Sequence, residues 1–217
     1  MGGFNGWRHT LVLGCDFSSS PTKTKPIVIA LGQLEQGRVR LNELHTFPSL
    51  DEWGDWLQHE GDWVGGFDLP FGLPRELVLE LGWPQTWAAC MDHYCALSRA
   101  EIRAQFKAFC DARPVGNKFA HRACDIPAGS SPSMKWVNPP VAYMMHAGVP
   151  RLRTAGLHLA GLCDGDPRRV ALEAYPGLLA RELIGNRSYK SDDRSKQTAD
   201  RKSTRLNSSH ANISYAV

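Results

Sequence analysis

Three acidic residues stand out because each lies at or near the end of a short apolar run. Asp16 follows the apolar residues of TLVLGCDF, Asp68 those of WVGGFDL and Glu173 those of RVALEA. Apolar runs of this length, bounded by turn residues, are typical of buried strands. In open α/β sheets, sites gather beyond the carboxyl ends of the strands. If the three strands are neighbours, we expect the three carboxylates to lie close together.

Carboxylates that converge repel one another unless a cation neutralises them. Their oxygens are natural ligands for Mg²⁺ or Mn²⁺, and two such ions can promote cleavage of a phosphodiester. We therefore predict that Asp16, Asp68 and Glu173 are catalytic metal ligands, with Mg²⁺ or Mn²⁺ as the cofactor. The alternative is structural, because an acid at a strand end can also cap a loop or pair with an arginine.

Polar side chains in loops supply further candidates. Hydroxyl and basic groups can contact phosphate, and imidazole can act as a general acid or base because it titrates near neutral pH. The candidate substrate-binding residues are Ser18, Lys23, Arg122, Asp125 and Lys135, and His121 is a candidate catalytic residue. The alternative is that the serine- and lysine-containing loop is a solvated turn and that His121 is a structural hydrogen-bonding residue.

The elements that must position these residues can be read from the apolar pattern. Residues 10–17, 26–34 and 38–47 are predicted to form three strands joined by short links, hence an antiparallel meander. Ser49 is expected to cap a helix, and the strand at 63–69 is reached through that helix. A strand reached through a helical crossover is most simply parallel to an earlier strand.

The second half of the chain is less regular. Residues 75–113 are expected to be helical in two or three pieces, whereas 114–149 read as a long irregular polar loop. Residues 169–174 are predicted to form a strand, and Pro176 is expected to begin a helix that ends at Ile184. The fold class is therefore α/β, with a mixed sheet flanked by helices and a helical and loop insertion.

Several segments, taken in order, resemble the domain-of-unknown-function 429 family. They are GCDFSSSPTKTKPIVIA, GGFDLPFGLP, HRACDIP, VNPPVAYMM and ALEAYPGLLARELIG, and the resemblance spans roughly 11–190. That family is regarded as one of inferred nucleases with an RNase H-like fold. The resemblance implies that Asp16 and Asp68 lie side by side on the first and fourth strands, with Glu173 on the fifth. It also implies that the loop containing His121, Arg122 and Asp125 closes the site.

The final residues, 200–217, look unlike what precedes them. They resemble a translated sequencing adapter, so we expect a non-native tail and a native reading that stops near Ala199. The expected organisation is one domain over 1–199, truncated at its C-terminus, with an insertion over about 75–165. The formal charge of the chain is +3, and removing three basic residues and one acid of the tail from totals of 25 and 22 leaves +1. A near-neutral domain must bind nucleic acid through a local patch.

The remaining composition narrows the location and the class of protein. No run of eighteen apolar residues and no apolar signal core occur, so we expect a cytoplasmic protein that does not engage a membrane. A zinc site remains open as an alternative from the cysteines and histidines of the middle region, although their spacing fits no standard pattern. That set is Cys90, His93, Cys95, His121 and Cys124.

Three functions from different classes are compatible with these residues. The first is a divalent-metal-dependent nuclease with nucleic acid as substrate. The second is a nucleotide-binding phosphotransferase, because Asp16 with its Ser/Thr loop also resembles the first phosphate loop of the actin-like ATPases. The third is a non-catalytic RNase H-like interaction module in which the acids are structural. P-loop, dinucleotide, nucleophile-elbow and zinc-protease motifs are not found in the chain.

Overall fold

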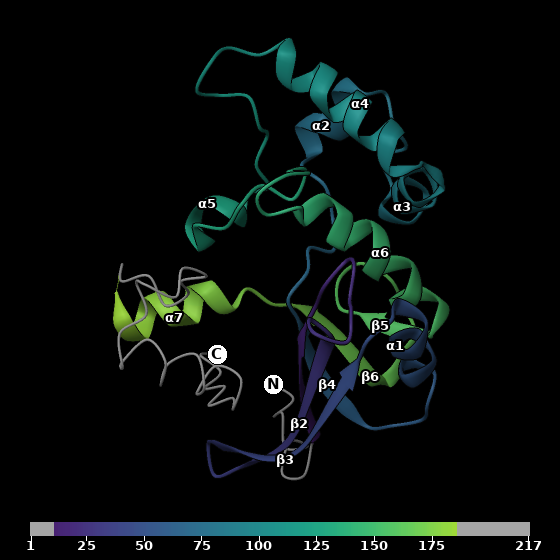
Figure 1. Cartoon of the computed structure of the whole chain (residues 1–217), viewed down its shortest axis with the longest axis vertical. Helices are drawn as coiled ribbons and strands as arrows, with labels where there is room; N and C mark the ends of the chain where they lie inside the picture. Colours follow the sequence, from purple (N-terminus) through teal and green to yellow (C-terminus); the bar gives the residue numbers. More distant parts are fainter. Residues whose placement is uncertain (1–10, 186–217) are drawn as a thin grey trace, which may run out of the picture.

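The computed structural model describes residues 11–185, and within them one mixed sheet has the strand order β3-β2-β1-β4-β6-β5 (Figure 1). The strands are β1 Leu11–Asp16, β2 Ile27–Glu35, β3 Arg38–Phe47, β4 Trp63–Phe67, β5 Leu157–Leu159 and β6 Asp166–Glu173. The helices are α1 Leu50–Leu57, α2 Arg75–Glu80, α3 Trp87–Ala96, α4 Arg99–Asp111, α5 Asp125–Ala128, α6 Val141–Thr154 and α7 Pro176–Ile184. The expected tail at 200–217 lies outside the described residues.

The sheet combines an antiparallel meander with parallel strands, as the sequence predicts. β1, β2 and β3 pair antiparallel in sequence order, and β4 then pairs parallel to β1. β6 is parallel to both β4 and β5. The β2–β3 hairpin turns at Gln36 and Gly37, which both have positive φ and so give the tight turn that a two-residue hairpin needs. The result places β1, β4 and β6 side by side with their carboxyl ends at one edge.

One face of the sheet carries the hydrophobic core. Alternate residues of β1 and β4, such as Cys15 and Phe67, are buried, as alternation in a strand requires. Helices α1 and α6 cover this face, and Trp53 of α1 packs against Phe67. Gly148 of α6 lets that helix approach closely, because a Cβ there would meet Leu69 within 2.7 Å. Helix α6 is therefore held directly against the segment that follows Asp68.

The insertion between β4 and β6 is more helical than the sequence indicates. Helices α2, α3 and α4 confirm the pieces expected over 75–113, and they gather beyond one end of the sheet (Figure 1). The expectation of an irregular segment through Val149 is wrong, because α6 begins at Val141. Gly148 and Pro150 disrupt the helical pattern in the sequence, yet α6 continues through both because it packs on α1 and α3.

Helix α7 begins where it is predicted, with Pro176 in its first turn. It leaves the end of β6 and extends away from the sheet (Figure 1). Across residues 11–185, none of the helices has the length and apolar character needed to cross a bilayer.

Candidate active site at the ends of the parallel strands

Asp16 is the last residue of β1, and Asp68 directly follows β4, the neighbouring parallel strand. The β1–β4 ladder pairs Cys15 with Phe67, and the Asp68 N–H donates to the Cys15 carbonyl at 2.9 Å. This bond continues the register of the ladder by one residue, so Asp68 follows β4 beside Asp16. The charges of both aspartates act on the Cys15 thiol, which agrees with their lying near each other at the carboxyl ends of β1 and β4. We call these two residues the aspartate pair.

Glu173 does not join this pair. The β4–β6 ladder pairs Glu173 with Phe67, and the Ala174 N–H donates to the Phe67 carbonyl at 2.9 Å. Glu173 is therefore aligned with Phe67, the residue before Asp68. Its side chain points to the same face of the sheet as that of Phe67. Among the described residues, no three histidine, cysteine, aspartate or glutamate side chains lie close enough together to hold a metal ion. The three expected carboxylates thus do not form a common metal-binding group in the part of the chain that the structure describes.

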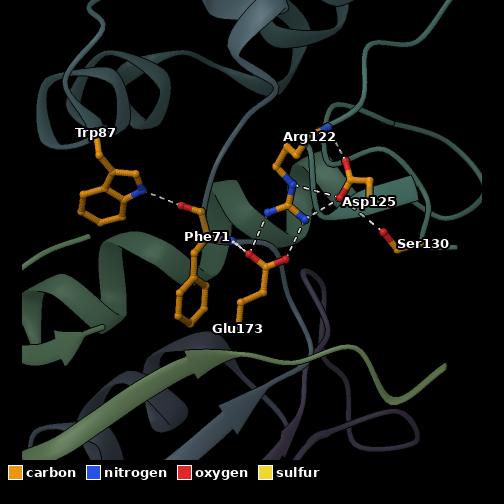
Figure 2. Close-up of polar contacts among 6 residues, drawn as sticks. All are labelled: Phe71, Trp87, Arg122, Asp125, Ser130 and Glu173. Carbon is orange, nitrogen blue, oxygen red and sulfur yellow. Dashed lines mark hydrogen bonds and ion pairs between the residues drawn. The ribbon is translucent and has the colours of Figure 1, made fainter. Parts of the chain in front are cut away.

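Glu173 instead binds Arg122, which also binds Asp125 (Figure 2). Arg122 donates Nη1–H to Glu173 Oε2 at 2.7 Å and Nη2–H to Oε1 at 2.6 Å. Its Nε and Nη2 donate to Asp125 Oδ1 at 3.0 and 2.8 Å, and its backbone N–H donates to Oδ2 at 2.8 Å. We call these three side chains the Arg122 network. The loop that contains Arg122 and Asp125 therefore contacts one of the three acids, Glu173, through a bidentate ion pair.

The Arg122 network is held in a largely dry environment. The Asp125 side chain is 0% exposed, that of Arg122 14% and that of Glu173 31%. Burial works against the charged guanidinium, but the hydrogen bonds and charges of Glu173 and Asp125 outweigh it and raise the pKa of Arg122 above its usual range. Arg122 therefore stays charged, and carboxylates accept hydrogen bonds along two edges of its guanidinium.

The aspartate pair also makes its surroundings negative. Burial raises the pKa of the Cys15 thiol well above its usual value, and the charges of Asp16 and Asp68 raise it further. Cys15 is thus an inert core thiol. The same negative charges attract a cation to the strand ends where the two aspartates lie.

A hydrogen-bonded chain links the Arg122 network to helix α3 (Figure 2). The Phe71 N–H donates to Glu173 Oε2 at 2.8 Å, and Trp87 Nε1–H donates to the Phe71 carbonyl at 2.6 Å. The same residues line a pocket of about 300 Å³ between α2, α3 and the end of β6. Phe71 lies three residues after Asp68, so one short segment connects the aspartate pair to the pocket.

The other expected site residues, Ser18, Lys23, His121 and Lys135, lie in loops. Ser18 Oγ accepts from the Ser20 N–H at 3.3 Å, and Lys23 is exposed in a turn closed by Thr22 and Lys25. This loop follows Asp16 directly, so Ser18 and Lys23 lie at the same edge of the sheet as the aspartate pair. His121 is exposed beside Arg122, and Lys135 is half-buried in the turn before α6.

The structure reveals residues that the sequence does not single out. Arg99 of α4 donates to the Ser19 carbonyl at 2.8 Å and stacks on Tyr143, so it ties the loop after Asp16 to the helices. Trp87 and Phe71 look like ordinary core residues in the sequence, and their polar contacts become visible only in three dimensions. The alternative zinc set is not assembled among the described residues: Cys90 is buried and Cys124 is exposed.

Comparison with protein-family models, with curated proteins and with solved structures finds no match to this chain. The likeness to the domain-of-unknown-function 429 family therefore remains a resemblance of short segments. The functional argument depends on the geometry described above.

Proposed function

We propose that this chain is a divalent-cation-dependent nuclease with an RNase H-like fold that hydrolyses phosphodiester bonds of nucleic acid. The observation that carries the proposal is the position of Asp16 and Asp68 at the carboxyl ends of adjacent parallel strands, joined by the Asp68 N–H bond to the Cys15 carbonyl. The strand order β3-β2-β1-β4-β6, antiparallel and then parallel, supports the RNase H-like assignment. The resemblance to a family of inferred nucleases points in the same direction.

The aspartate pair fits Mg²⁺ or Mn²⁺. Both donors are carboxylate oxygens, and ions of this kind are commonly held by one or two carboxylates while keeping waters and substrate phosphate oxygens. The charges of the two carboxylates attract such an ion. When bound, the ion supplies charge neutralisation at phosphorus and an activated water.

Within this proposal the protein residues have separate tasks. Asp16 and Asp68 hold the cation, whereas Glu173 fixes Arg122 and the Phe71 N–H and so shapes the adjoining loop. Glu173 serves as a third ligand only after it leaves Arg122. Ser18 and Lys23, in the loop that follows Asp16, are placed to contact phosphate from the same edge. A cytoplasmic location, in keeping with six unpaired cysteines, belongs to the same proposal.

Thermal unfolding with and without Mn²⁺ tests the metal site. A ligand that binds the folded state stabilises it by about 2.7 kcal/mol at one hundred times its Kd. We expect Mn²⁺ to raise the melting temperature of the parent and to do so far less for Asp16→Asn and Asp68→Asn. Asp164→Asn is the matched control, because this exposed acid precedes β6 at the opposite end of that strand from Glu173.

The rival functions predict other results in the same experiment. A non-catalytic module with structural acids predicts that Asp16→Asn lowers stability and leaves the response to Mn²⁺ unchanged. A phosphotransferase predicts stabilisation by an adenine nucleotide with Mg²⁺. If Asp16→Asn and Asp68→Asn both respond to Mn²⁺ as the parent does, the proposed metal site is wrong.

A further inference from the structure

The pocket beside the Arg122 network is built for a small ligand. Its volume of about 300 Å³ is at the small end of the range of ligand pockets, roughly 300–1,000 Å³. Apolar and aromatic side chains form most of its lining, including Phe71, Leu73, Trp87 and Met91. Arg122 and Glu173 form its polar end. Such a combination of apolar walls with few polar groups is typical of sites that orient an organic molecule.

The net charge at the polar end of the pocket disfavours the binding of an anion. One guanidinium is bracketed by two carboxylates, so the Arg122 network carries a net charge of −1. Its hydrogen bonds to Glu173 and Asp125 use four of the five N–H donors of the Arg122 side chain, and the fifth is on Nη1. Nη1 is the nitrogen on the side of Phe71 and Trp87 (Figure 2). Within residues 11–185 this N–H has no acceptor, so it can donate to a neutral acceptor in the pocket. The expectation that Arg122 clamps phosphate finds no support in this geometry.

The aromatic wall is held in position before any ligand binds. Trp87 is fixed by its hydrogen bond to the Phe71 carbonyl, and the guanidinium of Arg153 lies over the Trp87 ring at 5.6 Å. The Phe71 backbone is fixed in turn by Glu173. Because these bonds restrict the rotation of the indole, a flat ligand that packs against it loses little affinity to side-chain ordering.

We propose that this pocket binds one nucleobase of the nucleic-acid substrate. A nucleobase is flat, neutral and small, and it carries ring-nitrogen or carbonyl acceptors at its edge for the Arg122 Nη1–H. Stacking of a base on an aromatic side chain is favourable for every base, which suits a pocket that supplies few specific polar groups. The identification of the base as part of a nucleic-acid substrate rests on the proposed nuclease function. Phe71 follows Asp68 by only three residues, so the pocket adjoins the segment that carries a proposed metal ligand.

Binding of adenosine in the presence of EDTA tests the pocket separately from the metal. We expect the parent to bind adenosine, detected by saturation-transfer NMR and quantified by equilibrium dialysis. Ribose 5-phosphate, which has the sugar and phosphate without the base, is expected to bind at least about tenfold more weakly, because the net negative charge disfavours phosphate and no ring is available to stack. Equal binding of the two compounds would overturn the proposal.

A matched pair of variants locates the binding. Leu162 lines the pocket and is 40% exposed, so Leu162→Trp places an indole in the pocket mouth without disturbing the core. Leu44 on β3 is 44% exposed and is not among the lining residues, so Leu44→Trp is the control. We expect Leu162→Trp to weaken adenosine binding at least about tenfold, which corresponds to about 1.4 kcal/mol. We expect Leu44→Trp to bind as the parent does, and equal binding by both variants would refute the assignment.

A competition experiment then identifies the source of the base. A short oligoadenylate should displace adenosine from the parent if the pocket accepts a base within a chain, and failure to displace it would overturn the assignment to a substrate base. The outcomes separate the two proposals. Adenosine binding without any Mn²⁺-dependent cleavage counts against the nuclease alone, whereas cleavage without adenosine binding counts against the pocket alone.

Discussion

Replacing Arg122 with methionine removes the cation that holds the Arg122 network together. Methionine keeps the unbranched apolar part of the side chain but not the guanidinium, so the loss is mainly that of the charge and of five hydrogen-bond donors. Asp125 then keeps the backbone N–H of residue 122 at 2.8 Å and the Ser130 hydroxyl at 3.3 Å. It lacks the counter-charge for a carboxylate that is 0% exposed. Glu173, which is 31% exposed, retains the Phe71 N–H and partial access to water. The loss of stability therefore comes mainly from the uncompensated charge of Asp125.

The expected loss of stability of Arg122→Met follows from the burial of the Arg122 network. Breaking a buried ion pair by removing one partner costs about 3–5 kcal/mol, because it leaves an uncompensated charge. The partial exposure of Glu173 favours the low end, about 3 kcal/mol. For a chain of this size, each kcal/mol shifts the melting temperature by about 2–4 °C, so Arg122→Met is expected to melt about 6–12 °C lower.

Calorimetry or circular dichroism of the parent and Arg122→Met measures this shift. Lys107→Met is the control, because Lys107 pairs with Asp111 on an exposed helix surface, where ion pairs contribute little. We expect the control to melt close to the parent. If Arg122→Met melts as the control does at pH 7, the Arg122 network does not stabilise the fold and its described geometry is wrong.

Two other predictions test different parts of the fold. Hydrogen bonds from the Arg168 N–H and the Arg169 side chain lower the pKa of Asp166 to about 2. The stabilising contribution of Asp166 is therefore present above about pH 4 and is lost as the pH falls through about 2. NMR titration of the Asp166 carboxyl carbon measures this pKa, and a midpoint near 4 would contradict the prediction. Iodoacetamide at pH 8 should modify the exposed Cys124 and spare the buried Cys15, whose pKa is raised. Mass spectrometry of the native protein shows which cysteine is labelled first, and faster labelling of Cys15 would refute its burial.

The strands and most helices are predictable because their signals are local. Apolar runs mark β1 and β4, and Ser49 caps α1 by accepting the Glu52 N–H at 3.1 Å, as its sequence suggests. Helix α6 escapes prediction because Gly148 and Pro150 contradict it locally, and only packing against other elements stabilises it. Local preference and tertiary contact disagree there, and the contact decides the structure.

The candidate site is predictable only in part, because register decides which side chains meet. Sequence places Asp16, Asp68 and Glu173 at the ends of neighbouring strands, but a shift of one residue sends a side chain to the other face. Asp68 follows β4 beside Asp16, whereas Glu173 pairs with Phe67. The structural alternative, an acid that pairs with an arginine, thus describes Glu173. Its partner, Arg122, is fifty-one residues away in the sequence, and no local pattern indicates that pairing.

The proposed aspartate metal site is tested most directly by cleavage of end-labelled single-stranded RNA and DNA in the presence of Mn²⁺. The account predicts that the parent and Asp164→Asn cleave at the same rate, that EDTA abolishes cleavage, and that Asp16→Asn is slower by about two orders of magnitude or more. Loss of one ligand charge that stabilises the transition state by several kcal/mol sets that size. Cleavage by Asp16→Asn at the rate of the parent, or no Mn²⁺-dependent cleavage by the parent on either substrate, would contradict the account.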